Sequence, residues 1–178
     1  MDISISSRKR LLAQGRVYVD QLSTEIDGSK VKMLVLSIGS GVGVVPISED
    51  GKFLMVREYR VGAAELQWNW PAGGIEMGES AEDCIRRELL EETGYETGDL
   101  HYLGHFNSAP SYLEGYLKYY YTTDIKKVAL PRDESLLEDI RFFTREEVLS
   151  MIASGEIKHT GTIAAFFLTV HQLVGNAN

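Results

Sequence analysis

The sequence has one cysteine, few basic residues and no long apolar run. Cys84 is the only cysteine among 178 residues, so an internal disulfide is excluded and a reducing compartment is compatible. Lysine and arginine number 18 against 26 aspartates and glutamates, a net charge of −8. Nonspecific nucleic-acid binders normally carry a basic patch, so we do not expect nucleic acid as a partner. Because no apolar run suffices for a signal peptide or a membrane span, we expect no membrane partner and a soluble, cytoplasmic protein.

The chain does have the length and the hydrophobic content for a substantial core. Its 178 residues are 44% hydrophobic, which predicts one main domain with a small extra element. The sequence patterns predict strands, a helix, further strands and two final helices. This order is typical of an α/β (α+β) unit with a mixed central sheet between helices.

The N-terminal part predicts a β-hairpin. Residues 16–22 and 31–38 are β-rich and are joined through a turn at residues 27–29. A bare hairpin is only marginally stable, so it must pack on its own domain or on a second subunit, and both remain open. We therefore divide the chain into an extension, residues 1–40, and a main domain, residues 41–178.

The most informative stretch runs from Ala72 to Tyr95 and predicts a glycine-rich loop followed by one helix. Ser80 is a good N-cap, and Gly94 suits the C′ position at which helices often end. On this helix Glu88, Glu91 and Glu92 stand at i, i+3 and i+4, so their carboxylates are neighbours.

At about 100° per residue, Glu88 and Glu92 fall on the side of Ile85, which should face the protein. Inward carboxylates require a cation or a hydrogen-bond donor, and clustered hard oxygen ligands suit Mg²⁺ or Mn²⁺. The alternative is an ordinary charged helix with Arg86 and Arg87 on a solvated face, which explains the inward carboxylates badly.

Such cations would neutralise a diphosphate, orient it and lower the pKa of a bound water. The sequence contains no serine or cysteine nucleophile with a local histidine, so water is the expected attacker. The implied reaction is hydrolysis of a phosphoanhydride.

Several side chains outside this helix are candidates for binding substrate. Arg57 and Arg60 stand at the end of a predicted strand, and Arg60 is the better phosphate contact because a guanidinium matches phosphate oxygens with paired donors. A surface salt bridge is an equally good interpretation of Arg60. Tyr112 lies in a predicted loop and is free to touch a ligand. Trp68 and Trp70 either stack on a base or close the core, and the core is favoured.

The glycine loop and the helix together resemble the signature of the Nudix hydrolases. Gly73, five residues, Glu79, seven residues, and then Arg87-Glu88-Leu89-x-Glu91-Glu92-x-Gly94-Tyr95 match it at every specified position. The resemblance implies a Nudix-type α/β/α sandwich formed by residues 41–178. It also implies an enzyme that acts on phosphoanhydride bonds with Mg²⁺ as cofactor, or with Mn²⁺ in its place.

The resemblance also implies roles for single residues. Arg87 should orient a glutamate of the signature, and Glu79 should brace the loop. The implied metal ligands are the backbone carbonyl of Ala72 and the side chains of Glu88, Glu91 and Glu92.

Within the family, Trp70-Pro71-Ala72-Gly73 and Pro110 look like marks of the ADP-ribose pyrophosphatases and nucleotide-sugar hydrolases. This similarity implies hydrolysis of ADP-ribose, GDP-mannose or a related compound to a nucleoside monophosphate and a sugar phosphate. Members of the branch commonly have glycine after this proline, where this chain has Ser111, and the preference for sugar and nucleoside stays open.

The branch often places its general base in a later loop, which residues 133–140 resemble. We expect Glu138 to be this base, and Glu134 is the second candidate. Glu91 is expected to contribute to catalysis as a further metal ligand or hydrogen-bonding partner. The alternative interpretation of residues 133–140 is a solvated acidic loop without a catalytic role. The branch usually forms dimers, so we expect a homodimer to which residues 16–38 contribute. Two other functions remain open: a Nudix pyrophosphatase for nucleoside triphosphates, dinucleotides or capped RNA, and a non-enzymatic nucleotide-sugar sensor.

Overall fold

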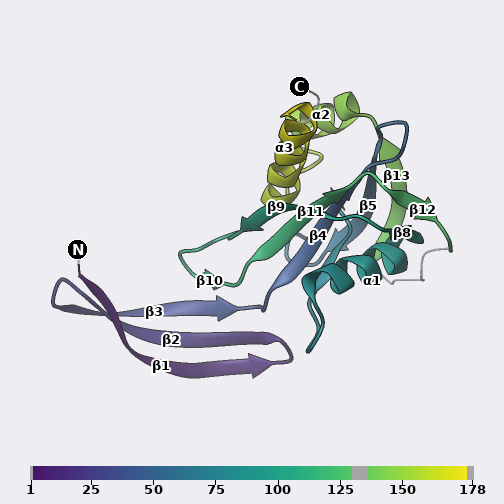
Figure 1. Cartoon of the computed structure of the whole chain (residues 1–178). Coiled ribbons are helices and arrows are strands. Elements are labelled where there is room, and N and C mark those ends of the chain that lie inside the picture. Colours follow the sequence, from purple (N-terminus) through teal and green to yellow (C-terminus); the bar gives the residue numbers. More distant parts are fainter. Residues whose placement is uncertain (1, 130–135, 176–178) are drawn as a thin grey trace. The chain divides into compact units, whose positions relative to one another are not determined.

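The computed structural model describes residues 2–129 and 136–175 (Figure 1). The chain divides into two compact units. The first unit contains Met1–Ser40 and Asn107–Tyr116, and the second contains Gly41–Phe106 and Leu117–Asn178. The segment after Asn107 therefore joins the N-terminal residues, although it is distant from them in sequence.

The first unit is one sheet with the strand order β1-β2-β3-β10. Its strands are β1 (Ile3–Gln14), β2 (Val17–Ile26), β3 (Ser29–Ser37) and β10 (Leu113–Glu114). The predicted hairpin is confirmed as β2 and β3, which pair antiparallel across a turn where Asp27 and Gly28 have positive φ. Strand β1 was not predicted, because all of its residues are exposed and its polar and charged side chains give no alternating pattern.

A charged cluster crosses this sheet. Asp20 on β2 is fully buried, and its carboxylate accepts a hydrogen bond from Arg10 Nε at 3.0 Å and lies 3.4 Å from Arg8 Nε. The hydrogen bond from Arg10 lowers the pKa of Asp20 despite the burial. Arg8 also donates to both carboxylate oxygens of Glu114 at 2.9 Å, so one side chain connects β1, β2 and β10.

The second unit contains two larger sheets and a short ribbon. In the mixed sheet, with the order β7-β4-β11-β9, β11 runs parallel to β4 and the other pairs are antiparallel. The second sheet has the order β13-β5-β6, and β8 pairs with β12. The strands are β4 (Gly41–Pro46), β5 (Phe53–Arg60), β6 (Glu65–Asn69), β7 (Ala72–Gly74), β8 (Tyr95–Thr97), β9 (His101–Phe106), β11 (Leu117–Thr122), β12 (Ile125–Lys127) and β13 (Leu137–Phe143).

Helices cover both faces of the mixed sheet, and Figure 1 shows α1 and α3 on opposite sides of β4 and β11. Helix α1 (Ala81–Thr93) packs on Val42, Val44 and Tyr120. Helix α3 (Thr160–Gly175) packs on Val45 and Tyr119 of the opposite face. Alternation along β4 and β11 divides these side chains between the two cores. The predicted mixed α/β architecture is confirmed.

The two predicted final helices and the predicted packing of both tryptophans are also present. Helix α2 (Arg145–Ser154) begins with a capping box formed by Thr144 and Glu147. Trp70 is 1% exposed and donates its indole N–H to the carbonyl of Thr162 at 2.9 Å, and Trp68 is buried too. Both indoles therefore close the core. Within the described ranges, no helix combines the length and the apolar character needed to cross a membrane.

Candidate active site

The loop between β7 and α1 is stabilised by its own hydrogen bonds. Glu79 accepts a hydrogen bond from the Glu76 amide at 3.0 Å, and Ser80 Oγ accepts one from the Asp83 amide at 3.1 Å as the N-cap. At the other end Gly94 has a φ of 74°, and its N–H donates to the Leu90 carbonyl. The predicted loop and helix are confirmed, with the helix ends where the sequence placed them.

Two glutamates of α1 turn inward onto the backbone of β7. Glu92 is 3% exposed, and its Oε2 accepts a hydrogen bond from the Ala72 amide at 3.2 Å. Glu88 lies directly on Gly73, where an added Cβ would stand 1.8 Å from Glu88 Oε1. Only glycine leaves room for this carboxylate. The structure thus turns Glu88 and Glu92 inward, as the helical spacing predicted, and brings them to the backbone of Ala72 and Gly73.

Arg87 donates hydrogen bonds to three acidic side chains. Its Nε and Nη2 donate to the two oxygens of Glu79 at 2.9 and 3.0 Å, a bidentate pair. Its Nη1 donates to Glu88 Oε1 at 2.7 Å and to Glu91 Oε2 at 3.3 Å. Nη2 also lies 3.4 Å from the Gly74 carbonyl oxygen. One guanidinium therefore ties the loop to two carboxylates of α1.

This arrangement shifts the proton affinities of the groups involved. The hydrogen bonds from Arg87 lower the pKa of Glu79 to about 2, and Glu79 in turn raises the pKa of Arg87. Burial raises the pKa of the Cys84 thiol to about 12, with the nearby Glu79 adding to the shift. Cys84 is consequently a buried, neutral thiol near neutral pH, and a neutral thiol is a weak nucleophile.

The described residues contain no group of three or more His, Cys, Asp or Glu side chains already arranged to hold a metal ion. Glu88 and Glu91 instead meet the positive charge of Arg87, and Glu92 meets a backbone amide. The donor set nevertheless fits a divalent cation of the Mg²⁺ type, because it consists of carboxylate oxygens gathered at the backbone of Ala72 and Gly73.

The other candidate residues of the second unit lie on β5 and β13. Arg57 Nη1 is 3.1 Å from Glu138 Oε2, and Arg60 Nη2 is 2.7 Å from Glu58 Oε2. Glu138 falls at a register shift of β13, where the pairing to β5 skips one residue. Its side chain is about half exposed, so it is accessible to a water molecule. Glu134 lies outside the described residues.

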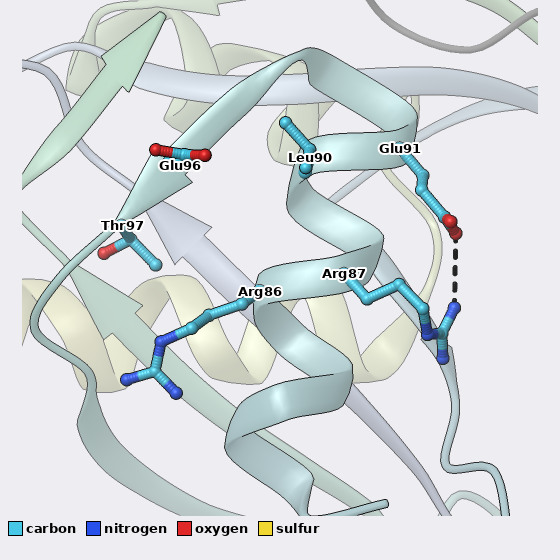
Figure 2. A pocket seen from close by; sticks show the side chains of 6 residues that line it. All are labelled: Arg86, Arg87, Leu90, Glu91, Glu96 and Thr97. Atoms are coloured by element: carbon cyan, nitrogen blue, oxygen red, sulfur yellow. Dashed lines mark hydrogen bonds and ion pairs between the residues drawn. The ribbon is translucent and has the colours of Figure 1, made fainter. Parts of the chain in front are cut away.

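An open groove of about 460 Å³ follows the outward side of α1 (Figure 2). Arg87 and Glu91 point together to one side of the helix, while Arg86 points away from them toward the strand that carries Thr97. Leu90 lies between the two sides. The groove opens the Arg87–Glu91 pair to solvent.

Tyr112 belongs to the first unit and lines a separate cavity of about 320 Å³ there. Arg8 and Leu22 from the sheet face it, together with Glu114 of β10. Arg8 was not a candidate from the sequence, because its place beside Tyr112 depends on strand β1.

Comparisons with known proteins agree with the geometry of the second unit. A family model described as the NUDIX domain matches residues 38–166, more than half of the chain. The ADP compounds hydrolase NudE of Escherichia coli (strain K12) is 29% identical over 135 residues, 75% of this chain and 72% of that protein. The ADP-ribose pyrophosphatase of Bacillus subtilis (strain 168) is 26% identical over 162 residues, 88% of this chain and 87% of that protein.

A crystal structure of an ADP compounds hydrolase shows the same fold, with a TM-score of 0.86 at 23% identity. The similarity covers 99% of this chain and 96% of that chain. The chain therefore belongs to the Nudix family and is a pyrophosphohydrolase, as the signature between Gly73 and Tyr95 predicts.

Proposed function

We propose that this protein hydrolyses the diphosphate bridge of ADP-ribose or a related nucleoside diphosphate sugar, and releases a nucleoside monophosphate and a sugar phosphate. The observation that carries the proposal is the convergence of Glu88 and Glu92 on the β7 backbone, with Arg87 holding Glu88 and Glu91. The two named relatives act on ADP compounds and on ADP-ribose, which supports this substrate class.

Divalent metal is the expected cofactor, with Mg²⁺ proposed and Mn²⁺ as a substitute. The side chains of Glu88, Glu91 and Glu92 and the carbonyl of Ala72 would hold it, and the bound ion would neutralise the diphosphate and acidify a water. In this proposal Arg87 positions two of the carboxylates, and Glu79 holds Arg87 through its paired hydrogen bonds.

A general base has to remove a proton from the attacking water. Glu138 is our proposed base, because its side chain is accessible to water and lies beside Arg57. Glu134 remains the second candidate. Arg57 and Arg60 would also offer guanidinium donors to the phosphates, and Tyr112 remains our candidate for a substrate contact in the first unit.

The first unit supports our proposal of a homodimer. Apolar side chains are exposed on both faces of its sheet, with Ile5 and Met33 on one face and Leu12 and Leu34 on the other. A sheet of this size rarely stays stable with both faces in water, so a second copy is the proposed cover. Sedimentation analysis should give a dimer for the natural chain and a monomer for Leu34→Glu.

In this scheme residues 1–40 are an extension and residues 41–178 the hydrolase domain, in a cytoplasmic protein. The substrate proposal is tested by incubating the protein with Mg²⁺ and ADP-ribose, GDP-mannose, nucleoside triphosphates, dinucleotides and capped RNA. We expect nucleoside monophosphate and sugar phosphate from a nucleotide sugar. If nucleoside triphosphates, dinucleotides or capped RNA are hydrolysed in preference to nucleotide sugars, the protein is a pyrophosphatase for that class of compound. If it binds a nucleotide sugar but hydrolyses none of the compounds, it is a sensor.

A further inference from the structure

The last turn of α1 combines several negative charges. Residues 90–93 include two of the proposed metal ligands, Glu91 and Glu92, and contain no lysine or arginine. The carbonyl groups at the C-terminus of a helix also carry a partial negative charge, which adds to that of the two carboxylates. A positive charge or hydrogen-bond donors from another element would therefore stabilise this turn.

The end of β12 supplies both. The ammonium group of Lys127 donates a hydrogen bond to the carbonyl oxygen of Thr93 at 2.7 Å. The amides of the next two residues, Val128 and Ala129, both donate to the carbonyl oxygen of Gly94, at 3.0 and 3.2 Å. We call Lys127, Val128 and Ala129 the capping segment of α1. Its three donors bind two consecutive carbonyl groups at the end of the helix.

The capping segment packs closely against Gly94. A Cβ added to Gly94 would overlap the carbonyl of Ala129 and would stand 3.0 Å from Lys127 Nζ. Gly94 also has a φ of 74°, which favours glycine. The last glycine of the signature therefore ends the helix and leaves room for the capping segment.

A second contact fixes the position of the Lys127 ammonium group. Strand β12 pairs antiparallel with β8, which places Lys127 opposite Tyr95. Lys127 Nζ lies 4.8 Å from the centroid of the Tyr95 ring, within the range of a cation–π interaction. The Tyr95 ring in turn packs edge to face on Phe142 of β13, with the two centroids 5.8 Å apart. The aromatic packing therefore holds the ammonium group beside the carbonyl of Thr93.

Thr93 connects the capping segment to the proposed metal ligands. It is fully buried, and its hydroxyl group donates to the carbonyl of Leu89, so the last turn is packed as one unit. The preceding residue is Glu92, which is 3% exposed and accepts the hydrogen bond from the Ala72 amide. A shift of Thr93 would therefore move the Glu92 carboxylate relative to the backbone of β7.

We propose that Lys127 is a positioning residue for the hydrolysis. Its ammonium group holds the last turn of α1 so that Glu91 and Glu92 keep the positions that a divalent metal requires. It acts through Thr93 and the helix backbone and does not touch the substrate. The effect on metal binding rests on the proposed function, in which these two glutamates are metal ligands; the capping of α1 does not.

The first test compares Lys127→Met with Lys126→Met in the metal-free, full-length protein. Lys126 is the matched control, because it is the preceding residue of the same strand and its side chain is exposed. Hydrogen exchange of the Thr93 and Gly94 amides measures how firmly the last turn is held. We expect exchange about tenfold faster in Lys127→Met, since a hydrogen bond from a charged donor is lost, and the natural rate in Lys126→Met.

The second test measures Mn²⁺ binding through the paramagnetic resonance signal of the free ion. Loss of a residue that orients a metal ligand typically weakens metal binding by about 10- to 100-fold, and we expect about tenfold for Lys127→Met. Lys127→Arg keeps the charge and the donors and should restore most of the affinity. With Mg²⁺ and ADP-ribose, kcat of Lys127→Met should fall while KM stays unchanged, because Lys127 does not contact the substrate.

A purely structural cap would change the unfolding free energy of Lys127→Met and leave its Mn²⁺ affinity and kcat at the natural values. That result overturns the proposal, as do equal exchange rates in the two methionine variants or a failure of Lys127→Arg to restore Mn²⁺ binding. Unchanged Mn²⁺ affinity in Glu92→Gln would instead contradict the proposed function. The exchange rates of the metal-free protein would still decide whether Lys127 holds α1, so the two failures are distinguishable.

Discussion

Gly73 and Glu88 are in such close contact that a single methyl group between them would occupy the position of the carboxylate. A Cβ added to Gly73 would lie 1.8 Å from Glu88 Oε1 and 2.6 Å from Glu88 Cγ. Glu88 of α1 therefore packs directly against the backbone of the glycine loop. This contact is the physical reason for a glycine at the start of the signature.

Gly73→Ala should displace the Glu88 carboxylate and lower kcat by about 10²-fold, the loss typical of a misplacement near 1 Å. Overpacking should also cost about 1–3 kcal/mol of unfolding free energy. Gly62→Ala is the control, because a Cβ there meets no atom within 4 Å. Steady-state kinetics and urea unfolding measure both effects, and full activity of Gly73→Ala would show that Glu88 need not occupy this position.

Arg87→Ala should leave Glu79, Glu88 and Glu91 as neighbouring carboxylates without their shared donor. We expect a loss of about 1–3 kcal/mol in unfolding free energy, together with reduced activity. Arg86→Ala is the matched control on the next residue: it lies 3.8 and 4.0 Å from its acidic partners and should cost less than about 1 kcal/mol. Equal losses in the two variants would mean that Arg87 has no special structural role.

The stability of the fold should depend on pH through Glu79. Its pKa falls from 4.5 to about 2 on folding, so the unfolded chain binds the proton more readily than the folded chain. This contribution is fully present above pH 4.5 and is lost as the pH falls toward 2. Unfolding free energies measured from pH 6 to pH 2 should decline less steeply in Glu79→Gln than in the natural chain, and parallel curves would contradict the assignment.

Glu138→Gln should lower kcat by about 10²–10⁴-fold with little change in KM, since it removes the proposed proton acceptor and keeps the side-chain shape. Glu156→Gln, another exposed glutamate, is the control and should be fully active. A normal kcat in Glu138→Gln with a large loss in Glu134→Gln would assign the base to Glu134.

The sequence predicted local structure well wherever local signals are strong. Helix α1 follows from the cap at Ser80, the glycine at 94 and the acidic spacing between them, and the inward direction of Glu88 and Glu92 follows from helical geometry. Strand β1 was not predicted. A strand that is exposed on both faces needs no alternation of apolar and polar residues, so its sequence lacks the pattern by which strands are recognised.

The sequence also did not predict the contacts between segments that are far apart in the chain. The pairing of β10 with β3 joins segments that are far apart in the sequence, and nothing in Leu113 or Glu114 specifies their partners. Neither Tyr119 nor His159, which both lie against Gly161, was singled out from the sequence. Their meeting depends on the docking of α3 against β11, which no local pattern records.

The most direct measurement is the release of AMP from ADP-ribose by the natural chain and by Glu88→Gln, Glu92→Gln and their double variant, each with Mg²⁺ and with EDTA. Circular dichroism should first establish that every variant is folded. We predict Mg²⁺-dependent release by the natural chain, at least about 10²-fold slower release by each single variant and none above background by the double variant, as expected when metal ligands are lost. Undiminished release in EDTA, or by the folded double variant, would contradict a metal site at these carboxylates.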